Sequence, residues 1–118
     1  MKYMLLIHQG TTPTPPSQAW DELSEQEKGA VYGAYQALNE TPGVTPGLRM
    51  QPPETATTVR VKDGETLTTD GPFAETKEAL GGYLFFEAAD IDAAIELASR
   101  IPAASMGGAI EVRPIVEQ

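Results

Sequence analysis

The segment from residue 57 to residue 87 constrains the fold most, because it combines a hairpin pattern, a tight corner and a buried strand. Val59 and Val61 alternate with polar residues, which is the period of a strand with two unlike faces. Asp63-Gly64 then suits a two-residue type I′ turn, whose positive φ angles Gly adopts without steric cost. The turn sets the expected cross-strand pairs: Lys62 with Glu65, Val61 with Thr66 and Arg60 with Leu67. We therefore expect a solvent-exposed arm of two strands.

Helix caps and side-chain periodicity predict the other elements. Ser24 and Glu27 form a capping box ahead of an amphipathic pattern, which predicts a helix over residues 24 to 40. Asp90 caps a second helix, which Pro102 stops. The apolar face expected for this second helix consists of Ile91, Ala94, Ile95, Ala98 and Ile101. Short apolar runs predict strands at residues 3–8, 44–53, 83–87 and 110–115, with the proline-containing second run at a sheet edge.

The order of these elements predicts an α+β fold, ferredoxin-like βαββαβ with an inserted β-hairpin, in which two helices cover one face of a sheet. The other face would then be bare. Bulky strand residues on it would form an apolar patch too large for a soluble monomer. The candidates are Leu6, Leu84 and Phe86, or their alternates Leu5 and Phe85. We therefore expect a homodimer in which two sheets pack face to face.

Length and charge narrow the class of protein. The 118 residues are expected to form a single domain over residues 1–118. Seventeen acids against eight bases give a formal charge of −9, which argues against binding to nucleic acid or to an anionic membrane surface. Neither a signal sequence nor a membrane-spanning run is present, so a cytoplasmic location is expected. With no cysteine, thiol chemistry is excluded.

Four stretches of the chain form a characteristic set: the opening MKYMLLI, the hairpin with its corner TTVRVKDGETLTTDGPFAETKEALGGY, the helix DIDAAIELASRIPAA and the closing EVRPI. Together they resemble the YCII-related superfamily and specifically its DGPF branch, named for the residues that stand here as Asp70-Gly71-Pro72-Phe73. The resemblance implies a dimeric α+β barrel and a bacterial protein whose relatives often lie beside extracytoplasmic-function sigma factors. It does not imply a particular reaction, because the biochemical activity of this branch is generally unassigned.

The wider superfamily has a suspected histidine and aspartate pair, with its histidine on the first helix. Here the first predicted helix has no histidine, and His8 at the end of the first strand is the only one in the chain. The resemblance also implies that the proline-rich segment after His8, Thr11 to Ser17, is longer than usual. This segment reads as a stiff connector between strand and helix.

Asp70 is the main candidate for chemistry, and two interpretations stay open. Its carboxylate could act as a general base if apolar surroundings such as Phe73 raised its pKa. Alternatively, it could be an N-cap that accepts a backbone N–H from Phe73 or Ala74, which would lower that pKa. His8 could carry a proton, since an ordinary histidine titrates near neutral pH, or could simply be hydrogen-bonded or exposed.

The remaining candidates are ligand-binding residues. Phe73, Glu75 and Lys77 belong to the family-like stretch and could position a ligand, while Arg49 and Arg60 could meet an anionic one. No metal or cofactor motif is present, and none is expected. Two functions follow. One is binding of a small organic ligand in a cavity by the sheet, between the sheet and the hairpin arm, with acid–base chemistry from Asp70 and His8. The other is a non-catalytic regulatory module linked to a sigma factor system.

Overall fold

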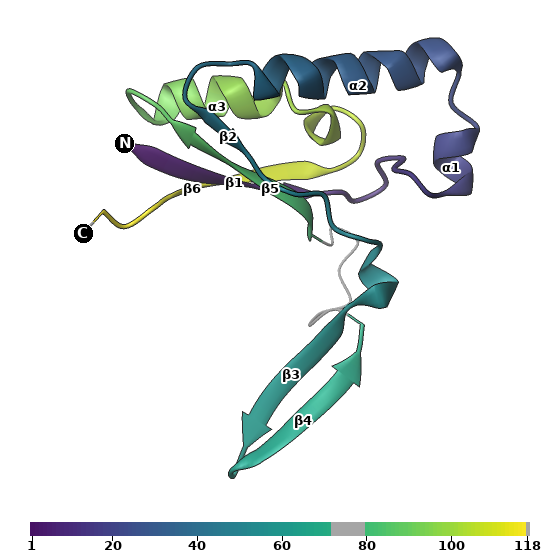
Figure 1. Cartoon of the computed structure of the whole chain (residues 1–118), viewed down its shortest axis with the longest axis vertical. Helices are drawn as coiled ribbons and strands as arrows, with labels where there is room; N and C mark the ends of the chain where they lie inside the picture. Colours follow the sequence, from purple (N-terminus) through teal and green to yellow (C-terminus); the bar gives the residue numbers. More distant parts are fainter. Residues whose placement is uncertain (72–79, 118) are drawn as a thin grey trace.

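The computed structural model describes residues 1–71 and 80–117, and Figure 1 shows a body of sheet and helices from which a hairpin extends. Antiparallel pairs of β-strands and three α-helices make this an α+β fold, as expected. No helix in the described ranges is both long and apolar enough to cross a membrane. The elements in chain order are β1 (Lys2–His8), α1 (Gln18–Asp21), α2 (Glu25–Asn39), β2 (Val44–Pro46), η1 (Pro53–Thr55), β3 (Thr57–Lys62), β4 (Glu65–Asp70), β5 (Leu80–Glu87), α3 (Ile91–Ser99), η2 (Pro102–Ala104) and β6 (Ala109–Pro114).

The body is a four-stranded sheet in the order β2-β5-β1-β6, with every neighbouring pair antiparallel. Figure 1 shows α2 and α3 together on one side of this sheet. The core lies between the two layers, where Leu38 of α2 and Leu97 of α3 are buried with Leu5 of β1. Thus one sheet face is covered by helices within the chain.

Strand register corrects the expected composition of the two faces. Leu5 lies opposite Leu84, and Leu6 lies opposite Tyr83. Residues directly opposite each other share a face, so Leu84 and the buried Phe86 belong with Leu5 beneath the helices. Grouping Leu6 with Leu84 and Phe86 was therefore wrong.

Both predicted helix caps are confirmed. In α2, the Ser24 hydroxyl accepts a hydrogen bond from the Glu27 N–H at 3.0 Å, and the Glu27 carboxylate accepts one from the Ser24 N–H at 3.0 Å. In α3, Asp90 accepts from the Ala93 N–H at 2.9 Å. These contacts satisfy backbone donors that a helix leaves without intrahelical partners.

The buried face of α3 differs from the expected one. Ile91 and Ile95 are 43% and 53% exposed, whereas Leu97 is fully buried beside Ala94 and Ala98. The two small alanines let the helix backbone approach the sheet, and Leu97 fills the remaining space. The buried stripe is therefore rotated away from the two isoleucines.

The predicted edge strand at residues 44–53 is much shorter in the structure. It ends at Pro46, which has no N–H for a ladder, although Met50 later donates its N–H to the Gly81 carbonyl at 3.0 Å. Gly47 follows Pro46 in close contact with β5, because a Cβ at this position would lie 2.1 Å from the Tyr83 carbonyl oxygen. The segment thus leaves the sheet ladder while remaining against β5.

The hairpin β3–β4 has the predicted register from Lys62 with Glu65 to Thr57 with Asp70. Asp63 and Gly64 have the positive φ angles, 52° and 79°, that the turn requires. Figure 1 shows the arm projecting away from the body, and Val59 and Val61 are exposed. The expected solvent-exposed arm is confirmed.

Candidate functional site

A pocket of about 290 Å³ lies between the loop after β1, the helices α1 and α2, and the strand β5. This volume is close to the lower end of the range for small-molecule sites, roughly 300–1,000 Å³. Its floor includes Ile7, Gly82 and Leu84 from the sheet. The pocket is on the helix-covered side of the sheet, whereas the sequence suggested a cavity between the sheet and the hairpin arm.

Aromatic rings form much of the wall. Trp20 of α1 and Tyr32 of α2 meet edge to face with ring centroids 5.5 Å apart, and Tyr35 lies one helical turn after Tyr32. Trp20 is only 6% exposed. Its position is set by a helix cap, since the Ser17 hydroxyl accepts the Trp20 N–H at 3.1 Å. These rings give the pocket an apolar surface that suits a flat organic molecule.

Two buried polar atoms belong to pocket-lining residues. Gln9 Oε1 and Thr12 Oγ1 have no hydrogen-bond partner within the part of the chain that the structure describes. A buried oxygen that loses its hydrogen bonds to water costs about 1–3 kcal/mol. Each of these two lining residues therefore carries a buried oxygen with unused hydrogen-bonding capacity among the described residues.

The loop that carries these two residues is held against the body by close backbone contacts. The Thr11 N–H donates to the Gly107 carbonyl at 3.1 Å, and the Thr12 N–H donates to the Gln9 carbonyl at 2.9 Å. Gly10 has a φ of 57°, and a Cβ there would lie 2.2 Å from the Gly107 oxygen. Only glycine permits this approach, so the loop conformation depends on glycine at position 10.

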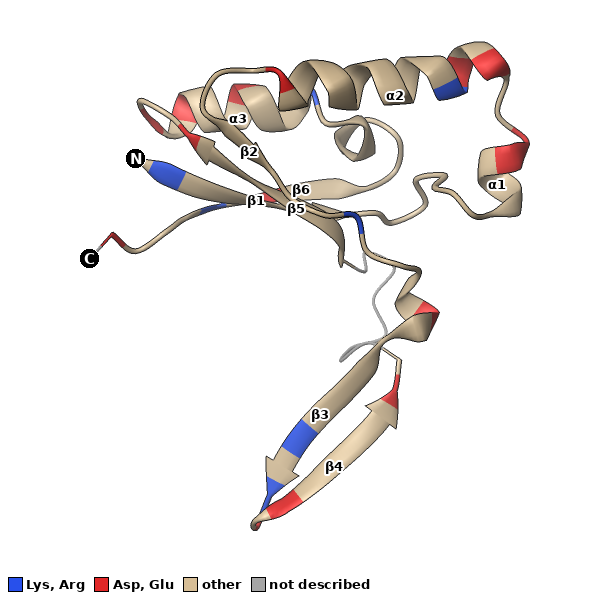
Figure 2. Cartoon of the chain, in the orientation of Figure 1, with Lys and Arg blue, Asp and Glu red and all other residues tan. Residues whose placement is uncertain are grey.

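Charge in the pocket differs from charge on the chain as a whole. Figure 2 shows acidic residues distributed over the helices and the arm, in keeping with the formal charge of −9. Among the described residues that line the pocket, only Arg49 carries a charged side chain. Burial raises the pKa of the Tyr35 phenol above its ordinary value, and the nearby Arg49 guanidinium partly offsets this shift. Tyr35 therefore keeps its O–H at neutral pH.

His8 and Asp70 occupy two different parts of the molecule, and neither lines the pocket. His8 Nε2 lies 3.5 Å from Glu111 Oε1 of the neighbouring strand β6. Glu111 also accepts a hydrogen bond from Arg113, which holds the pKa of its carboxyl below the ordinary value, with a smaller contribution from His8. The structure thus joins His8 to Glu111 rather than to Asp70.

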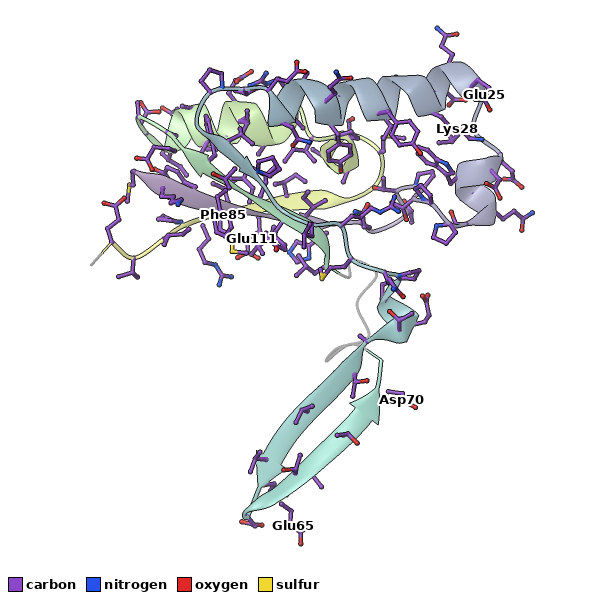
Figure 3. The ribbon with its side chains drawn as sticks, in the orientation of Figure 1. Glu25, Lys28, Glu65, Asp70, Phe85 and Glu111 are labelled. Atoms are coloured by element: carbon purple, nitrogen blue, oxygen red, sulfur yellow. The ribbon has the colours of Figure 1, made fainter. Side chains whose placement is uncertain are left out.

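Asp70 is the last residue of the exposed strand β4, opposite Thr57. Figure 3 shows it on the hairpin, well separated from Glu111 on the sheet. The following Gly71 has a φ of 98°, donates its N–H to the Ala56 carbonyl at 2.7 Å and accepts the Thr58 hydroxyl at 2.7 Å. This corner fastens the base of the arm.

Only some of the remaining predicted site residues belong to the part of the chain that the structure describes. Phe73, Glu75 and Lys77 lie outside the described residues, as do the backbone donors of Phe73 and Ala74 that Asp70 was expected to cap. Arg60 lies on the exposed strand β3. Within the described ranges, no group of three or more His, Cys, Asp and Glu side chains could hold a metal ion.

Comparison with known proteins shows the family. The model of the YCII-related domain matches residues 1–118. The chain belongs to the YCII-related domain family. It is also 35% identical over 117 residues to an uncharacterised protein of Rhizobium meliloti (strain 1021), covering 98% of this chain and 92% of that protein.

Most of the pocket residues in this YCII-related protein were not singled out from the sequence. Gln9, Thr12 and Trp20 lie in or next to the proline-rich connector, where no periodic pattern marks a buried position. One signal was available: a tryptophan followed in the next helix by Tyr32 and Tyr35 predicts clustered rings if the helices meet. Arg49 was predicted as a possible contact for an anion, and the structure places it on the pocket wall.

Proposed function

We propose that this YCII-related protein binds a small organic molecule in the pocket between its proline-rich loop, α1, α2 and β5. The observation that carries the proposal is the aromatic pocket with two buried oxygens, Gln9 Oε1 and Thr12 Oγ1, whose hydrogen-bonding capacity is unused among the described residues. An apolar cavity with a few converging polar groups is the usual form of a small-molecule site. Acid–base chemistry by Asp70 and His8 is not needed for this binding function.

Protein-observed nuclear magnetic resonance tests the proposal, because Trp20 is the only tryptophan of the chain and supplies the only indole N–H signal. The protein is titrated with a set of small aromatic compounds that includes acids, amides, amines and neutral molecules. We expect the Trp20 indole signal to shift in a saturable manner with some of them. If no member of the set shifts it, the pocket is not a binding site for such molecules.

We also propose that the protein is a homodimer, with the ferredoxin-like sheet packing through the face that the helices leave bare. The strand order β2-β5-β1-β6 and the placement of both long helices on one side support this arrangement. Met4, Leu6 and Phe85 project from the bare face, where Met4 lies opposite Phe85. Lys2 lies over the Phe85 ring at 5.6 Å from its centroid and covers only part of it. A second sheet would bury these side chains.

Membership of the DGPF branch is the finer family assignment that we propose. Its support is the sequence Asp70-Gly71-Pro72-Phe73 directly after the hairpin, together with the Gly71 corner that joins the arm to Ala56 and Thr58.

The exposed arm favours a second candidate function, contact with a regulatory protein partner such as a sigma factor. Val59 and Val61 are 59% and 70% exposed on one face of the hairpin, and β3 and β4 pair only with each other among the described strands. An apolar ribbon of this kind can dock on another protein through side chains or a strand edge. Replacing both valines by threonine keeps the strand propensity and should abolish partner recovery in a pull-down. Equal recovery with the variant would exclude this surface.

A further inference from the structure

We propose that the pocket selects an aromatic carboxylic acid bearing an N–H or O–H donor, with the carboxylate at Arg49 and the donor at Gln9 and Thr12. This inference rests on the proposed binding function and adds the chemical class of the ligand. Three independent properties of the wall carry it: a single positive charge, two acceptor oxygens and a set of aromatic rings.

The charge of the wall determines the first part of the ligand. Arg49 is the only charged side chain among the described lining residues, in a chain with a formal charge of −9. No described aspartate or glutamate of the wall competes for its guanidinium. Guanidinium groups bind carboxylates through two parallel hydrogen bonds, which a neutral amide cannot reproduce. The Tyr35 hydroxyl, which burial keeps protonated and which lies near Arg49, can donate to the same anion.

The acceptor oxygens determine the second part. Gln9 Oε1 accepts hydrogen bonds only, and Thr12 Oγ1 can accept one while its own proton rotates to suit the ligand. Both oxygens are buried without a hydrogen-bond partner among the described residues. A ligand N–H or O–H that reaches them would supply the missing donor. A ligand with only acceptor groups at this end would leave Gln9 Oε1 unsatisfied.

The rings determine the shape. Trp20 and Tyr32 stand edge to face, and Tyr35 is also part of the wall. A planar ring can stack on or meet the edge of these side chains with little loss of conformational entropy. The volume of about 290 Å³ suits one small ring system rather than a long chain.

Three matched probes test the assignment: 4-aminobenzoate, 4-aminobenzamide and benzoate, each titrated while the Trp20 indole N–H signal is recorded. We expect 4-aminobenzoate to bind about tenfold more tightly than the amide, since a hydrogen bond to a charged group typically contributes about this factor. Benzoate, which has no donor, should bind roughly threefold to tenfold more weakly than 4-aminobenzoate.

Variants identify the residues responsible. Arg49→Gln should bring the ratio of acid to amide affinity close to one, whereas Arg100→Gln removes the same charge at the end of α3, beside Glu96, and should leave the ratio unchanged. The inference is overturned if neutral aromatic compounds shift the Trp20 signal as strongly as the acids, or if Arg49→Gln preserves the preference for the acid. In both of those cases ligands still bind, so the proposed function survives. Failure of every compound in the wider aromatic set would instead remove the proposed function itself.

Discussion

The side chain of Gln9 occupies the space in which a Cβ at Gly81 would stand: that Cβ would lie 2.2 Å from Gln9 Cγ and 2.4 Å from Gln9 Nε2. Glycine on β5 is therefore what allows the amide of Gln9 to lie against the sheet at the pocket wall. In the proposed binding mode, this contact would connect a strand residue to the side chain that meets the donor of the ligand.

Gly81→Ala should displace the Gln9 amide while leaving the fold intact, because the overlapping atoms belong to a flexible side chain. We expect 4-aminobenzoate to lose its advantage over benzoate, as measured by titration of the Trp20 signal. The control is Gly29→Ala in α2, whose Cβ would have no neighbour within 4 Å and which does not line the pocket. An unchanged preference in Gly81→Ala would show that Gln9 does not recognise the donor.

Glycine to alanine substitutions should change stability in opposite directions at two sites. Gly10→Ala places a Cβ 2.2 Å from the Gly107 carbonyl oxygen at a residue with positive φ, so it should lower the free energy of unfolding by more than about 2 kcal/mol. Gly29→Ala in α2 meets no atom within 4 Å and should raise it by roughly 0.5–1 kcal/mol. Urea denaturation measures both. Equal effects at the two positions would contradict the close packing of the loop.

Glu27 should make the stability of α2 depend on pH. Hydrogen bonds from the backbone N–H and the side chain of Ser24 hold the pKa of Glu27 below its ordinary value of 4.5. A carboxyl whose pKa is lower in the folded state stabilises it above the ordinary value, and this contribution is lost as pH falls through the lower folded pKa. Glu27→Gln keeps an acceptor in the capping box but does not titrate. Below pH 4.5 the difference in unfolding free energy between wild type and variant should therefore shrink; a constant difference would be inconsistent with this linkage.

The homodimer is tested by sedimentation at micromolar concentration, where we expect twice the mass of the chain. Phe85→Glu introduces a charge on the bare sheet face and should yield a folded monomer. Ile95→Glu is the matched control, because Ile95 is exposed on α3, on the helix side of the sheet. A wild-type monomer would contradict the proposed packing, and a dimer in Phe85→Glu would place the interface elsewhere.

Turn and cap residues were sufficient to predict the hairpin and the starts of two helices from the sequence. The Asp63-Gly64 turn determined the hairpin register, and Ser24 and Asp90 marked the starts of two helices, because turns and caps depend on neighbouring residues. The rotation of α3 was not predictable in this way. Ile95 fits an amphipathic pattern as well as Leu97 does, and only packing against the sheet decides which is buried.

The candidate site depends on contacts between residues far apart in the chain. Gln9 meets Gly81, and Thr11 meets Gly107, so neither the pocket nor its acceptor oxygens could be found from local patterns. Asp70 stands in a distinctive tetrapeptide, yet the structure places it at the base of the arm, where it is exposed and does not line the pocket. The stretches spread over the whole chain indicated the YCII-related family, whereas the tetrapeptide did not indicate the pocket.

Ligand binding in this pocket is tested most directly by filling the pocket, which should abolish binding without unfolding the protein. Gly82 lies in β5 on the pocket floor, opposite Ile7, and a Cβ there meets other atoms only at ordinary contact distance. In Gly82→Val the branched side chain suits a strand and would occupy pocket volume. We expect a folded variant in which 4-aminobenzoate no longer shifts the Trp20 indole signal. A folded variant that binds it with wild-type affinity would contradict the claim that this pocket is the functional site.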